Sequence, residues 1–210
     1  MKAANDHLVF FNIDTQVDFM RPTGKLAIRN AHEIVPNLAA LMRWAREHDV
    51  PVISTADAHQ PDDPEFAVWP PHCVVGTPGQ ELIPETLFPS HLVIPALPGA
   101  FHPPARWEGQ FIVEKPVYSI EGNPNFTAIV SALGRRRAVV FGVATEVCVR
   151  ADALALRRQG LDVDLVTDAV KPISEDGGRA AIGEMQAAGV RLVTTSEVCK
   201  LTAEAPAPGG

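Results

Sequence analysis

Short apolar runs alternate with helical patterns along most of the chain, and this alternation constrains the fold more than any other feature. The run LVFFNI at 8–13 is continuous and ends at an aspartate, which is typical of a strand buried on both faces. Residues 31–48 then place apolar side chains at helical spacing. Further strands are predicted over 51–55, 91–95, 110–113, 138–142, 163–167 and 190–195, and further helices over 125–133, 147–159 and 174–188. The series predicts an α/β protein in which helices cover both faces of a parallel sheet.

Length and composition narrow the class of protein. The chain has 210 residues, and cores usually divide only beyond about 250, so we expect a single domain over 1–200 and a flexible Pro/Gly-rich tail over 201–210. No window is apolar over the roughly 20 residues that a membrane span needs, and the start lacks a signal-peptide pattern. The net charge of −7 offers no basic surplus for nucleic acid. Three cysteines fit a reducing compartment, so we expect a cytoplasmic protein.

Residues 56–109 interrupt the alternation with a long irregular stretch. Many of the 19 prolines lie between 61 and 124, and the stretch also holds Trp69 and several histidines. A loop of this length within a compact domain is usually functional or disordered, and its aromatic content argues against disorder. We expect 57–79 to form a lid stiffened by proline, because a fixed φ lowers the entropy lost when such a loop is ordered.

Three chemically distinctive side chains stand at predicted strand ends, where open parallel sheets bind ligands. Asp14 follows the run at 8–13, Lys115 follows the run at 110–113, and Cys148 starts the helix after 138–142. A thiol in the first helical turn meets the positive end of the helix dipole, which favours the thiolate. Asp14 could take the thiol proton, and Lys115 could lower the thiol pKa. The alternative is that Cys148 is a small buried apolar residue, Asp14 a turn cap and Lys115 a solvated charge.

A second group of residues has the composition of a metal site. Asp57 and His59 stand two apart in an extended segment, so their side chains point to one face. Glu65 and His72 follow on the irregular stretch and could complete a set of nitrogen and oxygen ligands, which suits Zn, Fe or Mn. The alternative is that His72 only packs beside its aromatic neighbour.

Five stretches together match the pattern of a known family. They are FFNIDTQVDFM around Asp14, TADAH ending at His59, WPPHCVVGTPGQEL from Trp69, VEKPVYS around Lys115, and VFGVATEVCVRADALALRRQG around Cys148. In these motifs the chain resembles the isochorismatase-like cysteine hydrolases, and among them the nicotinamidases most closely. The resemblance covers residues 7 to about 200. It implies a three-layer α/β/α, doubly wound fold with a mainly parallel sheet.

The resemblance also implies a catalytic triad of Asp14, Lys115 and Cys148. In this reading Asp14 takes the thiol proton and passes it to the leaving ammonia, Cys148 forms an acyl-enzyme, and Lys115 holds the charges together. A cis peptide bond is implied between Val143 and Ala144. The backbone N–H groups of Ala144 and Cys148 would form the oxyanion hole.

A metal ion and an aromatic pocket follow from the same resemblance. In nicotinamidases an Asp-x-His pair and two further histidines hold a metal that binds the pyridine nitrogen. Asp57, His59 and His72 match this set, and Glu65 takes the place of the third histidine. The implied cofactor is a divalent ion, Zn first, with Fe or Mn as alternatives.

The walls of the ring-stacking pocket fall on Phe19, Trp69 and Tyr118. The resemblance implies hydrolysis of a small planar amide, with nicotinamide giving nicotinate and ammonia, and it implies a homo-oligomer. The Lys115–Tyr118 spacing is shorter than in most nicotinamidases, so another small amide, such as a carbamoyl or ureido compound, is the nearest alternative. Two other readings stay open. A metal could activate water while Cys148 only fills the core, or the chain could be a non-catalytic binding module.

Overall fold

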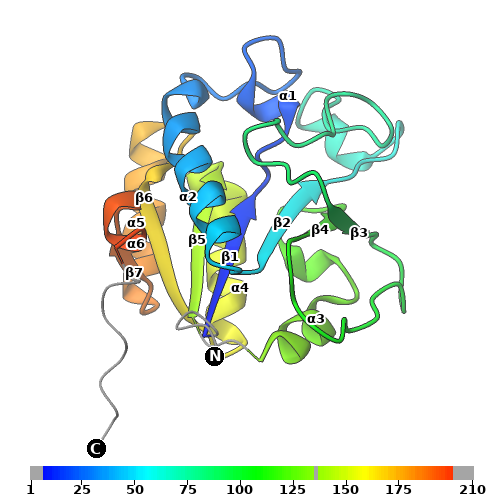
Figure 1. Cartoon of the computed structure of the whole chain (residues 1–210). Coiled ribbons are helices and arrows are strands. Elements are labelled where there is room, and N and C mark those ends of the chain that lie inside the picture. The colour runs from blue at the N-terminus through cyan, green and yellow to red at the C-terminus, as the bar shows by residue number, and fades with distance from the viewer. Residues whose placement is uncertain (1–6, 135–136, 201–210) are drawn as a thin grey trace, which may run out of the picture.

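The structure is a computed structural model that describes residues 7–134 and 137–200 (Figure 1). The predicted tail at 201–210 lies outside the described residues. Within those residues, no helix has the length and apolar character required to cross a membrane.

A seven-stranded sheet forms the centre of the molecule, with strand order β3-β4-β2-β1-β5-β6-β7 (Figure 1). The strands are β1 (Leu8–Ile13), β2 (Val52–Asp57), β3 (His91–Ile94), β4 (Gln110–Lys115), β5 (Arg137–Val143), β6 (Asp162–Lys171) and β7 (Arg191–Val193). Every neighbouring pair runs parallel. The chain winds outward from β1 in both directions, which confirms the doubly wound parallel sheet.

Helices cover both faces of this sheet, as the alternation predicts. They are α1 (Val17–Met20), α2 (Val35–Glu47), α3 (Phe126–Leu133), α4 (Arg150–Arg158), α5 (Glu175–Ala187) and α6 (Thr195–Val198). One apolar core joins the sheet to α2 and α6, and a second joins it to α3, α4 and α5. In β1, Phe10 belongs to the first core, whereas Val9 and Phe11 belong to the second, so successive side chains are buried on opposite faces.

Two strands run further than predicted, and their extra residues belong to the functional edge of the sheet. The predicted strands end at 55 and 113, whereas β2 continues to Asp57 and β4 to Lys115. These two residues are register partners on adjacent strands. A carboxylate and an ammonium side by side satisfy one another, so the ladder can continue through two charged residues that periodicity alone assigns to loops.

Other boundaries also differ from the prediction. The helix predicted over 31–48 divides into a 3-10 helix, Ala31–Ile34, and α2. The helix predicted from 147 begins as a π-helical turn, Thr145–Val149, that leads into α4. The last strand ends at Val193 because α6 begins directly after it. A capping box between Thr194 and Glu197 stabilises the N-terminus of this helix.

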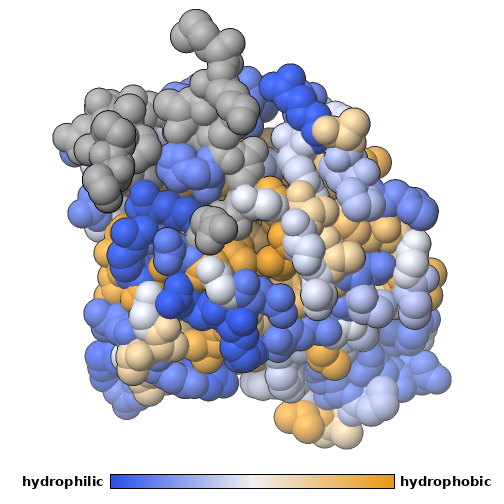
Figure 2. Space-filling view, turned by 90° about the horizontal axis from the view of Figure 1, so that it is seen from below, coloured by the Kyte–Doolittle hydropathy of each residue, from blue (hydrophilic) through white to orange (hydrophobic). Residues whose placement is uncertain are grey.

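The irregular stretch after β2 lies at the end of the sheet where the strands finish. It contains a 3-10 helix, Pro64–Ala67, and is tied down by isolated bridges between His59 and Val74 and between Gln16 and Leu82. Asp57 belongs to β2 rather than to this loop, which corrects the predicted start of the lid. The opposite end of the molecule, viewed in Figure 2, mixes hydrophilic and hydrophobic residues, as folded surfaces ordinarily do.

Candidate active site

Asp14, Lys115 and Cys148 meet at the carboxyl ends of three strands. Lys115 Nζ lies 2.8 Å from Asp14 Oδ2 and 3.7 Å from Cys148 Sγ. Asp14 and Lys115 are fully buried, and Cys148 is 5% exposed. The tertiary structure therefore brings together all three members of the predicted triad, from segments far apart in the chain.

The backbone around Asp14 is shaped to present its carboxylate. Asp14 has φ 46°, a left-handed conformation that is uncommon for a residue other than glycine and is often found at functional sites. Thr55 Oγ1 donates to Asp14 Oδ1 at 2.6 Å and accepts from the Asp14 N–H at 3.2 Å. One oxygen of the carboxylate is thus held by Thr55, and the other faces Lys115.

The turn that carries Cys148 depends on a glycine. Gly142 has φ 122°, and a Cβ at this position would lie 2.1 Å from the carbonyl oxygen of Ile13. Only glycine lets β5 pass this close to the end of β1. One residue further on, the Val143–Ala144 peptide bond is cis, as the family resemblance implies. The Cys148 turn is therefore brought beside Asp14.

Burial opposes the predicted activation of the Cys148 thiol. Burial raises the pKa of the Cys148 thiol well above its usual range, and Asp14 and Asp57 add to this although Lys115 opposes it. Lys115 lowers this pKa, as predicted, but burial together with the two carboxylates outweighs its effect. Burial also raises the pKa of Asp14, against the opposing effect of Lys115. Burial therefore favours the neutral form of both groups, the thiol of Cys148 and the carboxyl of Asp14.

A second cluster of polar atoms adjoins the triad. Asp57 Oδ2 lies 3.8 Å from His59 Nε2 and 3.9 Å from His72 Nε2, and Glu65 Oε1 also lies 3.9 Å from His72 Nε2. These separations are too long for hydrogen bonds. Ligands placed about 2.1 Å from a shared tetrahedral ion would be roughly 3.4 Å apart. The ligand atoms of Asp57, His59 and His72 all lie within 4.8 Å of one another, so a modest contraction would close these three around one ion, with Glu65 beside His72. The other oxygen of Asp57 contacts Lys115 Nζ, which joins the two clusters.

The histidines of this cluster are oriented as metal ligands usually are. His59 Nδ1 is hydrogen-bonded to Asp63 Oδ2 at 3.0 Å, and His72 Nδ1 to the carbonyl oxygen of Pro70 at 2.8 Å. His59 Nε2 is buried and has no hydrogen-bond partner among residues 7–134 and 137–200. Burial lowers the pKa of His59, but the neighbouring carboxylates of Asp57 and Asp63 outweigh it and raise that pKa to about 9. The residues present therefore fit a cation held at Nε2.

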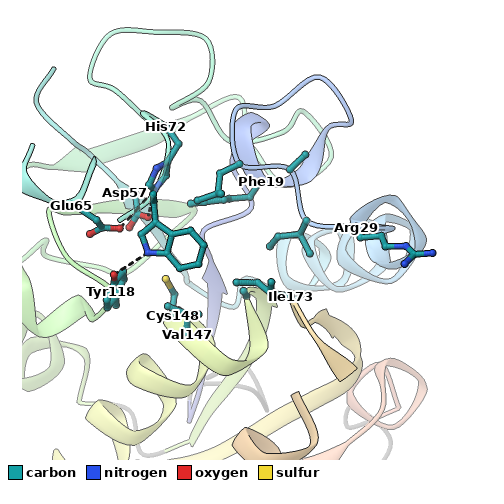
Figure 3. Close-up of a pocket in the computed structure, with 14 residues that line it drawn as sticks. Phe19, Arg29, Asp57, Glu65, His72, Tyr118, Val147, Cys148 and Ile173 are labelled. Carbon is teal, nitrogen blue, oxygen red and sulfur yellow. Dashed lines mark hydrogen bonds and ion pairs between the residues drawn. The ribbon is translucent and has the colours of Figure 1, made fainter. Parts of the chain in front are cut away.

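A cavity of about 210 Å³ opens above these groups (Figure 3). The predicted wall residues Phe19, Trp69 and Tyr118 all line it, together with Cys148. Trp69 Nε1 donates to Tyr118 Oη at 3.1 Å, which joins two sides of the pocket. Sequence reasoning missed the apolar side of the cavity, which comes from Leu26, Ala27, Ile28, Val147 and Ile173. Apart from Val147, which lies in the motif around Cys148, these residues belong to no motif that marks them.

The polar groups and the apolar wall face each other across the cavity. In Figure 3, Asp57, Glu65 and His72 lie on one side, Ile173 lies on the other, and Cys148 stands at the base between them. A flat ring with one polar edge fits this division.

Comparison with known proteins is consistent with the predicted resemblance. A family model described as Isochorismatase domain matches residues 9–101 and 90–197. The nicotinamidase/pyrazinamidase of Mycobacterium tuberculosis is 32% identical over 196 residues, which covers 88% of this chain and 97% of that protein. This chain belongs to the isochorismatase family.

Solved structures share the fold of this isochorismatase-family chain. The crystal structure of pyrazinamidase from Pyrococcus horikoshii in complex with zinc is 29% identical, with a TM-score of 0.74, and the match covers 90% of this chain and 99% of that one. The crystal structure of N-carbamoylsarcosine amidase from Thermoplasma acidophilum is 25% identical, with a TM-score of 0.70, and the match covers 90% and 96% of the two chains.

Two supporting residues of this isochorismatase-family site were not predicted, although they lie in the FFNIDTQVDFM motif. Gln16 Nε2 donates to the carbonyl oxygen of Asp57 at 2.8 Å, and its Oε1 accepts from the Asp57 N–H at 2.8 Å. Asp18 accepts from the N–H groups of Cys73 at 2.8 Å and Lys25 at 2.9 Å. Their positions two and four residues after Asp14, within the same motif, could have indicated that they support the site.

Proposed function

We propose that this protein is a metal-containing cysteine amidohydrolase that converts nicotinamide to nicotinate and ammonia. The observation that carries the proposal is the contact of Lys115 with both Asp14 and Cys148 at the base of the cavity. Similarity to a nicotinamidase/pyrazinamidase over most of the chain supports the choice of substrate.

In the first half of the reaction, Cys148 is acylated. Asp14 takes the proton from Cys148 Sγ, and the sulfur attacks the amide carbon. Backbone N–H groups of Ala144 and Cys148 would stabilise the oxyanion. As the tetrahedral intermediate collapses, the C–N bond breaks and Asp14 returns the proton to the nitrogen, which leaves as ammonia.

In the second half, water releases the product. Asp14 takes a proton from a water molecule, the resulting hydroxide attacks the thioester carbon, and the C–S bond breaks to give nicotinic acid, which ionises to nicotinate in water. The departing sulfur takes the proton from Asp14, which restores the thiol. The negative charge moves between Asp14 and Cys148 as the proton is transferred. The ammonium of Lys115 contacts both side chains, so it stabilises that charge at each stage.

Burial of the triad limits the leaving group. Asp14 must reach the departing nitrogen, yet its side chain is fully buried. A bulky substituent on that nitrogen would meet packed protein, so we expect primary amides to be the substrates.

Asp57, His59, Glu65 and His72 would hold a divalent metal, Zn first, with Fe or Mn as alternatives. When bound, the ion supplies a Lewis acid for the pyridine nitrogen. Phe19, Trp69 and Tyr118 would flank the ring.

The test is ammonia release from nicotinamide by the purified protein. We expect activity in the wild type and none above background in Cys148→Ser or Cys148→Ala. Activity close to wild type in either variant would refute covalent catalysis and favour hydrolysis by the metal itself. Chelation is expected to weaken substrate binding more than it slows turnover.

A second candidate keeps the triad and changes the amide. Glu65 takes the place of the third histidine of the nicotinamidase pattern and adds negative charge there. An N-carbamoylsarcosine amidase shares the fold. The ammonia assay therefore includes a panel of carbamoyl and ureido compounds. Release from one of these and none from nicotinamide would favour the second candidate.

The protein is further proposed to act in the cytoplasm as a homo-oligomer, without a nucleic-acid or membrane partner. All three cysteines are unpaired, as in a reducing compartment. Leu92, Val93 and Leu97 are at least half exposed and could be covered by another copy. Light scattering after size-exclusion chromatography measures the mass, and a monomer would contradict the assembly.

A further inference from the structure

Asp152 is a buried carboxyl that the proposed reaction does not use. It lies in the first turn of α4, four residues after Cys148, so both side chains project from the same side of the helical segment. Asp152 is fully buried and does not line the cavity.

The contacts of Asp152 lead to the pocket wall. Asp152 Oδ1 accepts from the N–H of Ile120 at 2.6 Å. Ile120 follows Tyr118 closely, and Tyr118 Oη accepts from Trp69 Nε1. The same short segment is held at its other end, because Lys115 Nζ donates to the carbonyl oxygen of Val117 at 3.3 Å. The segment 116–120 that carries Tyr118 is thus fixed between Lys115 and Asp152.

The charge of Asp152 can be inferred from its surroundings. Three buried carboxyls, Asp14, Asp57 and Asp152, lie near one ammonium, that of Lys115. Asp14 and Asp57 contact this ammonium directly, whereas the one hydrogen-bond partner of Asp152 among the described residues is the Ile120 amide. Its second oxygen has no hydrogen-bond partner among the described residues. An ionised carboxylate would be poorly solvated in this position.

The electrostatics agree with this geometry. Burial raises the pKa of Asp152 well above its usual range, although Lys115 and the Ile120 amide oppose it. A protonated carboxyl still accepts a hydrogen bond at its carbonyl oxygen, so it can hold Ile120 without adding charge beside Cys148.

We propose that Asp152 is a positioning residue whose neutral carboxyl holds the Ile120 amide and thereby keeps Tyr118 and Trp69 over the nucleophile. The inference deepens the proposed function, since it concerns the pocket of that same site. It identifies a second layer of the pocket that is contributed by the helix of Cys148.

The test compares two substitutions at Asp152. Asp152→Asn keeps the acceptor oxygen and the neutral charge, so we expect kcat, KM and the pH profile within about twofold of wild type. Asp152→Ala removes the acceptor and is expected to raise KM about fivefold, with kcat less affected. This factor is the change in affinity expected from losing the free energy of one hydrogen bond. Asp164→Ala removes another buried carboxylate, one paired with Arg137 and Arg191 away from the site, and controls for loss of stability alone.

A second measurement does not depend on the substrate. Alkylation of Cys148 by iodoacetamide reports how well the pocket is closed, even if nicotinamide is not hydrolysed and the proposed function fails. We expect alkylation about fivefold faster in Asp152→Ala and unchanged at every pH in Asp152→Asn. If Asp152→Asn shifts the pH dependence of alkylation, the carboxyl is ionised and the proposal is wrong. The proposal is also wrong if Asp152→Ala, assayed at a temperature where it is folded, has the same KM and the same alkylation rate as the wild type.

Discussion

Replacing Lys115 by methionine tests how the site is held together. Met has a similar length and no charge, so Lys115→Met leaves Asp14 and Asp57 buried without the ammonium that contacts both. Removing one partner of a buried ion pair costs about 3–5 kcal/mol, because the remaining charge is no longer compensated. In a domain of this size that corresponds to a fall in Tm of roughly 6–20 °C. We also expect amidase activity to be lost.

Urea denaturation of four proteins measures this effect. They are the wild type, Lys115→Met, Asp14→Asn and the double variant. Because Asp14→Asn removes one of the stranded carboxylates, the double variant should be more stable than the sum of the two single effects predicts. The matched control is Lys171→Met, which removes a lysine that pairs with an exposed glutamate and should change stability far less. A Lys115→Met variant within about 1 kcal/mol of wild type, or strict additivity in the double variant, would refute a buried charge network.

Three further predictions follow from the same site. Because the pKa of Cys148 is raised, its thiolate fraction should still increase as the pH passes about 9. The rate of iodoacetamide alkylation at Cys148, measured by peptide mass spectrometry, should therefore keep rising above that pH. A rate that reaches a plateau below neutral pH would contradict this prediction. Asp63→Ala removes the hydrogen-bond partner of His59 Nδ1, and His59 belongs to the proposed metal site. Titration with zinc should show affinity about 10–100-fold weaker than wild type, whereas equal affinity would argue against a metal at His59. Gly79→Ala should destabilise the protein by about 1–3 kcal/mol in urea, because its Cβ would lie 2.1 Å from an Asp18 carboxylate oxygen. Gly183→Ala, where a Cβ meets nothing within 4 Å, is the control and should not be destabilising.

Much of the fold follows from local patterns that a single sequence contains. The run at 8–13 is a strand with the predicted bounds, because six consecutive buried residues leave no polar face and therefore require cover on both sides. The helix that starts at Glu175 is capped by Ser174, which the sequence places at its start. The predictions were least accurate where tertiary contacts override local preference, as at Asp57 and Lys115.

The site was predictable in part for the same reason. Asp14, Lys115 and Cys148 stand at or beside strand ends, and parallel strand ends share one edge of a sheet, so their convergence follows from position in the sequence. Leu26 and Ile173 could not be predicted as pocket walls, because they lie on loops whose paths depend on packing with distant segments.

The sequence by itself determined the parallel α/β architecture, the edge of the sheet where chemistry occurs and the residues that meet there. The reason is that the local pattern of apolar residues predicts which segments are buried strands and where each strand ends. Only the tertiary structure decided the charge state of that edge. Lys115 lowers the pKa of the Cys148 thiol as expected, but burial and the neighbouring carboxylates raise it further than Lys115 lowers it. Asp152 is a buried partner of the pocket wall. The physical reason is that electrostatic energy depends on distance and desolvation between groups from different strands, and neither quantity is encoded in spacing along the chain.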